Sequence, residues 1–244
     1  MNTVKINSGK TKIIAHRGLS GIECENTCPA FVAAGNRSYF GIESDVHVSK
    51  DGEFIIIHDE TIKRVSEGKY DINVEESSYK DIENIILPDI DGTTTRKDIK
   101  IPLLAEYISI CKKYEKKAVL EVKKHFKVSD LERLIKEIKE MNYIENVIFI
   151  SFDLENCINI RNFLPQNTVQ WLIGKSEEIT KDLIQTLCKH NLDLDIHYKS
   201  LTKENIELLH LKDIKVNCWT CDDKDYAEKL VLWGVDYITT NILE

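Results

Sequence analysis

Three acidic residues in two predicted strands have the types and the spacing of ligands for a divalent cation. Glu43 and Asp45 are two residues apart in the predicted strand 39–48, so their side chains lie on one face of that strand. Glu121 lies in another predicted strand, 117–122. Carboxylates that share a site repel each other unless a cation lies between them. The set therefore indicates an all-oxygen site for Mg²⁺ or Ca²⁺ rather than a thiolate-rich zinc site.

Histidines and cationic residues follow the predicted strands close to these carboxylates. His16 and Arg17 come directly after the first strand, and His58 ends a later one. Lys123 lies two residues after Glu121. Taken singly, a His-Arg pair is usually a turn, and a surface Glu-x-Lys pair contributes little to stability. Because four separate segments bring polar groups to one predicted rim, we interpret the set as a catalytic site.

Two further residues near this rim keep two interpretations each. His47 shares the strand face of Glu43 and Asp45 but lies one step further out. We expect it to be solvated or bonded to a loop rather than to extend the metal shell. Trp219, in the predicted strand 215–220, either stacks on the organic part of a substrate or packs in the core.

The elements that must position these residues alternate between short apolar runs and amphipathic stretches, which is the pattern of repeated strand–helix units. Eight parallel strands are expected, near residues 14, 43, 120, 149, 171, 195, 217 and 238. Helices are expected at 27–36, 103–114, 129–141, 154–163, 180–190, 202–211 and 223–233, with Asn26 as the N-cap of the first. Eight strands close a (β/α)₈ barrel, whose active sites lie at the C-terminal ends of the strands. No eighth helix is predicted, and residues 1–11 are expected to cover part of the surface it would occupy.

One strand breaks this order. The turn Ser49-Lys50-Asp51-Gly52 is too short for the crossover that parallel strands require, so the strand 54–59 should form an antiparallel hairpin that returns His58 to the side of Asp45. Residues of about 60–100 are polar and weakly patterned, which indicates an insertion on the active-site side. The predicted fold class is therefore α/β, a TIM barrel of one domain over residues 1–244, with a small insertion after the hairpin that follows strand 2. An open doubly wound sheet is the alternative, but no glycine-rich phosphate-binding pattern supports it.

Composition narrows the class of protein. The 244 residues are 42% hydrophobic and 30% charged, with a net charge of −8, which argues against nucleic-acid binding. A small anionic substrate stays compatible if a local cation offsets the charge. The first residues lack a signal-peptide core, and no apolar run approaches the length of a membrane span. We expect a cytoplasmic enzyme without integral membrane association.

The seven cysteines are odd in number and scattered, which does not suggest a disulfide framework. Cys218 and Cys221 have C-x-x-C spacing, but on a strand positions three apart point to opposite faces. We therefore expect buried structural thiols rather than a redox or zinc pair.

The order of these motifs resembles the glycerophosphodiester phosphodiesterase family over residues of about 12 to 241. The resemblance begins with His16-Arg17-Gly18, Glu25-Asn26-Thr27, Ala30-Phe31, Glu43-Ser44-Asp45-Val46, Lys50-Asp51-Gly52 and His58-Asp59. It continues with Ile101-Pro102-Leu103-Leu104-Ala105-Glu106, Glu121-Val122-Lys123, Ser151-Phe152, Trp219-Thr220 and Gly234-Val235-Asp236.

This resemblance implies a TIM barrel and a reaction. It implies hydrolysis of glycerophosphodiesters to glycerol 3-phosphate and an alcohol, with a divalent metal held by three carboxylates. It also implies a role for each candidate residue, as follows: metal ligands Glu43, Asp45 and Glu121; general acid/base pair His16 and His58; phosphate contact Arg17; pocket lining Lys123; and, as one interpretation, substrate contact Trp219. Asn241 stands where the family commonly has aspartate, and we expect that difference to affect a local contact rather than the catalytic residues.

The chemistry fits these residues. A cation and a guanidinium stabilise charge that develops on the phosphoryl group, and imidazoles exchange protons near neutral pH. Attack by a neighbouring glycerol hydroxyl, through a cyclic phosphate, and direct attack by water both stay open.

Two other functions also stay open. The first is hydrolysis of lysophospholipids or sphingolipids, as in phospholipase D-like relatives, which would require an exposed apolar lip; Ile85-Ile86-Leu87 is the candidate stretch. The second is a barrel that binds a metal or anion without turnover. Such a protein would normally lose one of the five acid/base and metal residues, and all five are present.

Overall fold

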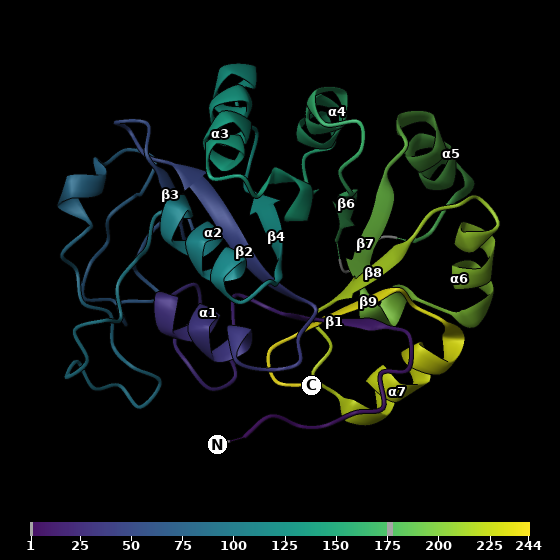
Figure 1. Cartoon of the computed structure of the whole chain (residues 1–244), viewed down its shortest axis with the longest axis horizontal. Helices are drawn as coiled ribbons and strands as arrows, with labels where there is room; N and C mark the ends of the chain where they lie inside the picture. The colour runs from purple at the N-terminus through teal and green to yellow at the C-terminus, as the bar shows by residue number, and fades with distance from the viewer. Residues whose placement is uncertain (1, 175–177) are drawn as a thin grey trace.

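A computed structural model describes residues 2–174 and 178–244. Eight parallel strands form a closed barrel in the order β1-β9-β8-β7-β6-β5-β4-β2, and pairing of β1 with β2 closes it (Figure 1). The parallel strands are β1 (Lys12–Ala15), β2 (Gly41–Val48), β4 (Lys117–Val122), β5 (Val147–Ser151), β6 (Val169–Ile173), β7 (Asp193–His197), β8 (Val216–Trp219) and β9 (Tyr237–Thr240). The predicted TIM barrel is confirmed.

Helices surround the barrel. They are α1 (Cys28–Gly35), α2 (Leu104–Lys113), α3 (Val128–Glu140), α4 (Leu154–Phe163), α5 (Lys181–His190), α6 (Lys203–His210) and α7 (Lys224–Trp233), with short 3₁₀ turns at Tyr79–Asp81, Ile144–Asn146 and Tyr198–Ser200. The main core lies between the helices and the outer face of the barrel. A smaller apolar group fills the barrel interior and consists of Ile14, Val119, Ile148, Ile150, Leu172 and Tyr237, with Phe40 and Trp219 packed against it.

The first helix begins one residue later than we predicted. Its N-cap is Thr27, whose hydroxyl accepts a hydrogen bond from the Ala30 amide, so the prediction of Asn26 as the cap is wrong. The reason is local: Asn26 has a positive φ of 54°, whereas an N-cap residue adopts extended backbone angles. The Asn26 side chain is instead turned toward β2.

The predicted hairpin is present and places the second histidine. Strand β3 (Phe54–Ile56) pairs antiparallel with β2, with Val46 opposite Ile56 and Val48 opposite Phe54. The amide of Ile57 then donates to the carbonyl of Asp45 over 3.1 Å. The residue that follows, His58, is therefore held beside Asp45, as loop length alone indicated.

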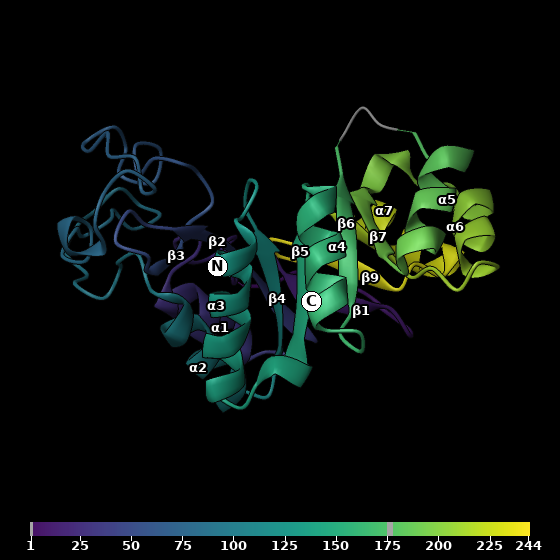
Figure 2. The ribbon, with the colours of Figure 1, turned by 90° about the horizontal axis from the view of Figure 1, so that it is seen from above.

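Residues 57–103 form an irregular insertion beside β3, on one side of the barrel (Figures 1 and 2). The insertion has its own apolar core, which includes Ile55 of the hairpin strand. The buried members are Ile55, Ile57, Ile62, Val74, Ile82, Ile85, Leu87, Ile99 and Ile101. Two of the three residues expected at an apolar lip, Ile85 and Leu87, are therefore core residues. That a single domain spans the chain stays a prediction.

The N-terminal segment runs along the last residues of the chain. The amide of Val4 donates to the carbonyl of Ile242 over 3.0 Å, and the amide of Ile6 donates to that of Glu244 over 2.9 Å. Ile6 also packs against the main core. Met1 lies outside the described residues. In the described part of the chain, no helix has the length and apolar character needed to cross a bilayer.

Candidate active site

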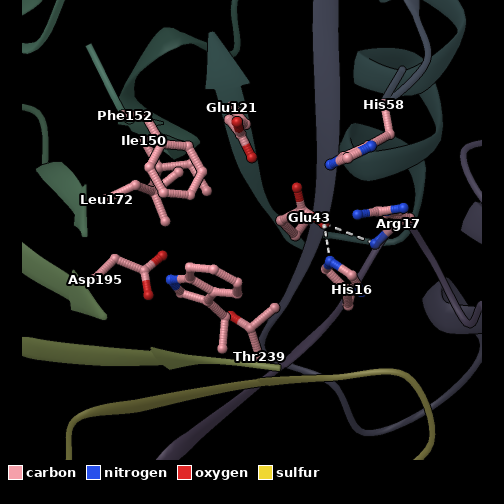
Figure 3. Close-up of a pocket in the computed structure, with 11 residues that line it drawn as sticks. His16, Arg17, Glu43, His58, Glu121, Ile150, Phe152, Leu172, Asp195 and Thr239 are labelled. Atoms are coloured by element: carbon pink, nitrogen blue, oxygen red, sulfur yellow. Dashed lines mark hydrogen bonds and ion pairs between the residues drawn. The ribbon is translucent and has the colours of Figure 1, made fainter. Parts of the chain in front are cut away.

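A cavity of about 140 Å³ lies at the carboxyl ends of the barrel strands and collects most of the predicted site. Its walls are His16, Arg17, Glu43, His58, Glu121, Ile150, Phe152, Leu172, Asp195, Trp219 and Thr239. Figure 3 shows His16, Arg17 and His58 on one side, Ile150, Phe152, Leu172 and Asp195 on the other, and the carboxylates of Glu43 and Glu121 between them. Asp45 and Lys123 are not among the lining residues, although Lys123 contacts Glu121 and Asp45 is the neighbour of Glu121 on β2.

The three predicted metal ligands come together. Asp45 and Glu121 are direct neighbours on β2 and β4, and Glu43 lies two residues before Asp45 on the same face. One oxygen from each carboxylate lies within 4.8 Å of the other two, and all three residues are buried. An all-carboxylate set of this size fits a hard divalent cation.

Two cations offset part of this buried negative charge. Lys123 Nζ lies 2.7 Å from Glu121 Oε1 and 3.3 Å from Asp45 Oδ1. Although burial opposes it, the charges of Lys123 and Arg17 hold the pKa of Asp45 well below its usual range. Burial and the charge of Asp45 raise the pKa of Glu43 well above its usual value and that of Glu121 to about 7. A divalent cation among the three carboxylates would remove the repulsion that raises these pKa values.

The backbone and a buried amide hold two of the predicted ligands, Glu43 and Asp45, in place. The amide of Arg17 donates to Glu43 Oε2 over 2.7 Å, and Asn26 Nδ2 donates to Asp45 Oδ2 over 2.8 Å. Asn26 Oδ1 in turn accepts from the hydroxyl of Ser44 over 2.8 Å. The residue predicted to cap a helix therefore orients Asp45, a predicted metal ligand, instead.

Both predicted catalytic histidines are held through Nδ1. His16 Nδ1 lies 2.7 Å from Asn241 Oδ1, and its Nε2 lies 4.0 Å from Glu43 Oε2. His58 Nδ1 lies 2.6 Å from Asp59 Oδ1. Burial, together with the charge of Arg17, lowers the pKa of His16 to about 4. Burial also lowers the pKa of His58, although the charge of Asp45 opposes this shift.

Arg17 offers a cationic group to the cavity. It adopts a positive φ of 52°, and its Nη1 donates to Glu25 Oε1 over 2.8 Å. Its Nε atom is buried, lies 3.7 Å from Asp45 Oδ2 and makes no hydrogen bond within the described chain. Glu25 also accepts from Arg64 of the insertion, which ties the insertion to the site.

The barrel interior beside the cavity contains polar groups that were not predicted from the sequence. Asn217 Nδ2 donates to Asp195 Oδ2 over 3.1 Å and to Gln170 Oε1 over 2.9 Å. Asp195 Oδ1, Gln170 Nε2 and Trp219 Nε1 are buried and have no hydrogen-bond partner within residues 2–174 and 178–244. Burial raises the pKa of Asp195 well above its usual value. Polar residues at alternate positions of β7, where apolar residues usually fill the barrel, are the signal that could have identified Asp195.

The residues with two interpretations are placed by their contacts. His47 Nδ1 lies 2.7 Å from Glu75 of the insertion and Nε2 lies 3.2 Å from the carbonyl of His58, so His47 bonds to loops as expected. Trp219 lines the cavity and meets Phe152 edge to face at 5.7 Å. All seven cysteines are unpaired, and Cys218 and Cys221 are buried, in agreement with structural thiols.

Comparison with known proteins gives one consistent result by sequence. The model of the glycerophosphoryl diester phosphodiesterase family matches residues 16–244. A curated protein of Caldanaerobacter subterraneus named glycerophosphodiester phosphodiesterase is 30% identical over 237 residues, which cover 95% of this chain and 94% of its own. Glycerophosphodiester phosphodiesterase 1 of Bos taurus is 26% identical over 271 residues, covering 96% and 79% of the two chains.

Solved structures share the fold. A glycerophosphodiester phosphodiesterase from Parabacteroides distasonis superposes with a TM-score of 0.78 at 25% identity, over 95% of this chain and 93% of its own. A phosphodiesterase from Oleispira antarctica, determined in complex with the product sn-glycerol-3-phosphate, superposes with a TM-score of 0.80 at 22% identity, over 98% and 96% of the two chains.

Proposed function

The chain belongs to the glycerophosphoryl diester phosphodiesterase family, and from that premise we propose that it hydrolyses small glycerophosphodiesters to sn-glycerol 3-phosphate and an alcohol. The observation that carries the proposal is one cavity that brings together two histidines, an arginine and the carboxylates of a cation site. These are the groups that phosphodiester hydrolysis requires: proton acceptor, proton donor and stabilisers of phosphoryl charge.

The proposed cofactor is Mg²⁺ or Ca²⁺, held by Glu43, Asp45 and Glu121. The close approach of three buried carboxylate oxygens supports it, since such a set is unfavourable without a cation. When bound, the cation supplies Lewis-acid stabilisation of the phosphoryl oxygens. Arg17 lines the cavity beside His16 and His58 (Figure 3), where its guanidinium adds a second positive group that would stabilise a bound phosphate.

We assign the proton acceptor to His16 and the proton donor to His58. Their Nδ1 partners differ in charge: an amide oxygen of Asn241 contacts His16, whereas the carboxylate of Asp59 contacts His58. A carboxylate stabilises an imidazolium and an amide does so less, so His58 holds a proton more readily. The negative phosphodiester raises the proton affinity of both rings when it binds.

The side of the cavity opposite His16 and His58 is proposed to bind the glycerol part of the substrate. It combines the apolar side chains of Ile150 and Leu172 with the unpaired polar atoms of Asp195 and Trp219. Hydroxyl groups both donate and accept hydrogen bonds and so complement such atoms. Lys123 is proposed to act by balancing the charge of Asp45 and Glu121.

The reaction is proposed to take place in the cytoplasm. All seven cysteines are unpaired, which suits a reducing compartment. The insertion does not favour the lysophospholipid alternative, because two of the three residues expected at its apolar lip are buried in the core of the insertion.

The test is release of glycerol 3-phosphate from glycerophosphocholine and glycerophosphoethanolamine, with lysophosphatidylcholine as a parallel substrate. We expect turnover of the two diesters that EDTA abolishes and that Mg²⁺ or Ca²⁺ restores, and loss of turnover in Glu43→Gln. Turnover of the lysolipid alone would favour the phospholipase D-like alternative. Absence of turnover with every substrate and metal would favour a binding protein.

A further inference from the structure

We propose that Asn241, oriented by Asp222, fixes His16 in the tautomer that carries its proton on Nδ1 and so presents an unprotonated Nε2 to the substrate. Neither Asp222 nor Asn241 lines the cavity, so both are positioning residues rather than catalytic ones. The inference rests on the proposed role of His16 as proton acceptor. The three residues follow β8, β9 and β1, which are consecutive neighbours around the barrel.

The carboxylate of Asp222 determines which way the Asn241 amide faces. Asp222 Oδ1 accepts from the backbone amide of Asn241 over 2.7 Å and from the hydroxyl of Thr240 over 2.8 Å. Asp222 Oδ2 lies 2.6 Å from Asn241 Nδ2. Because an ionised carboxylate only accepts hydrogen bonds, the NH₂ group of Asn241 must face Asp222. The reversed amide would place two acceptors at that short distance.

The orientation of Asn241 in turn determines the tautomer of His16. Asn241 Oδ1 lies 2.7 Å from His16 Nδ1 and 2.7 Å from the hydroxyl of Ser20. An amide oxygen has no proton to give, so His16 Nδ1 must donate. In the neutral ring Nε2 then carries the lone pair, and it is the nitrogen on the side of Glu43. The bond made by one ring nitrogen thus sets the protonation of the other.

Asp222, Asn241 and His16 form a hydrogen-bonded relay, and backbone hydrogen bonds fix the positions of its members. The amide of His16 donates to the carbonyl of Thr240 over 2.8 Å, and the amide of Gly21 donates to that of Asn241 over 2.9 Å. Asp222 therefore acts on His16 through one side-chain amide on a fixed frame. The direction of the hydrogen bonds in this relay can therefore be reversed by turning over the Asn241 side-chain amide, without movement of the backbone.

Asp222→Asn is the variant that tests this inference, because it changes one acceptor into a donor at constant size. The new side-chain amide must keep its oxygen toward the Asn241 backbone amide and the Thr240 hydroxyl, so its NH₂ group faces the Asn241 side chain. That side chain then turns over and presents NH₂ to His16, which forces the proton onto Nε2. We expect kcat to fall about 10²-fold or more while KM changes less than about threefold.

A second change should reverse the first. In the double variant Asp222→Asn with Asn241→Asp, the carboxylate at position 241 accepts both from the amide at position 222 and from His16 Nδ1. We expect kcat to return to within about tenfold of wild type, whereas Asn241→Asp alone places two carboxylates together and is impaired. A role limited to folding predicts additive losses and no rescue.

The direct readout is the ¹⁵N NMR signature of the His16 ring, assigned by its absence in His16→Gln. We expect Nδ1–H in wild type and in the double variant and Nε2–H in Asp222→Asn. Asp223→Asn, at the neighbouring cap of α7, is the control and should leave the tautomer unchanged. Should Asp222→Asn fail to fold, Asn241→Ala, which removes the acceptor of His16 Nδ1, should lose the single Nδ1–H form.

Retention of Nδ1–H in Asp222→Asn, or in Asn241→Ala, would overturn the inference. The ring signature does not depend on turnover. An inactive wild-type protein would therefore contradict the proposed function and leave the tautomer measurement to decide the relay.

Discussion

His16 and His58 lie on one cavity wall, and they differ in the group that contacts the Nδ1 atom of each ring. A neutral amide holds the Nδ1 of His16, and a carboxylate, itself bonded to Arg64, holds that of His58. The sequence shows both histidines and places Asp59 next to His58, but only the fold shows the partner of His16, because Asn241 is 225 positions away from it. Residue types predict a catalytic pair, and tertiary contacts are the basis of the roles proposed for its two members.

Metal affinity should depend on pH, because the ligands must be ionised. Burial, with the charge of Asp45, raises the pKa of Glu121 to about 7 and that of Glu43 well above its usual range. A protonated carboxylate must lose its proton before the metal binds, so affinity should fall as pH is lowered through the range around 7 in which Glu121 titrates. Titration calorimetry of Mg²⁺ across this range, in buffers that report proton release, measures the effect. Glu121→Gln should reduce the proton release, and affinity that is constant with pH would contradict the account.

Individual polar residues of the barrel interior were harder to predict than the ligands. Glu43 and Asp45 are recognisable because two carboxylates on one buried strand face are rare unless a charge partner or cation accompanies them. The alternating polar residues of β7 are a signal for Asp195, but Gln170 has no such signal in its strand. Both residues acquire their partner, Asn217, only when the barrel closes.

At the scale of elements, strands and helices were predictable because each carries a strong periodic pattern. The predicted helix 154–163 matches α4, and the predicted strand 117–122 matches β4. The hairpin was predictable from loop length, which is a geometric constraint rather than a preference. The N-cap of α1 was not predictable, because the Asn26 side chain makes hydrogen bonds with Asp45 and Ser44 of β2 instead of with its own helix.

The turn after β1 should be intolerant of a side chain at Gly18. Gly18 has a φ of +76°, and an added Cβ would lie 2.7 Å from the Ala30 backbone. Gly18→Ala should therefore lower the free energy of unfolding by about 2–5 kcal/mol, the sum of backbone strain and overpacking. Gly68→Ala is the control, since its φ is +80° but nothing lies within 4 Å, and it should cost only about 1–2 kcal/mol. Urea denaturation compares them, and equal losses would show that the close contact is unimportant.

At the scale of the whole molecule, the insertion and the barrel are joined through β3 and through Arg64 and Glu75, which reach the site. The sequence indicated where the insertion begins but not its separate core, because the apolar residues that form it have no regular spacing. A shared strand predicts that the two parts unfold together.

Ile82→Ala tests this prediction of one cooperative unit. Ile82 is fully buried in the core of the insertion, so its truncation should cost about 2–5 kcal/mol. The three tryptophans, Trp171, Trp219 and Trp233, all lie outside the insertion. Leu209→Ala in the main core is the matched comparison. If the chain unfolds as one unit, both variants should lower the urea midpoint measured by tryptophan fluorescence. An unchanged fluorescence midpoint beside a separate early transition in circular dichroism would indicate two units.

The central claim is that two histidines share proton transfer on a phosphodiester, and the most direct test varies the leaving group. A p-nitrophenolate leaves without a proton, whereas choline requires one. His58→Ala should therefore reduce hydrolysis of glycerophosphocholine by about 10²–10⁴-fold but hydrolysis of glycerophospho-p-nitrophenol by less than about tenfold. His16→Ala should impair both substrates alike, because the nucleophile must lose its proton in either case. Equal losses for His58→Ala on the two substrates, or full activity in His16→Ala, would contradict the account.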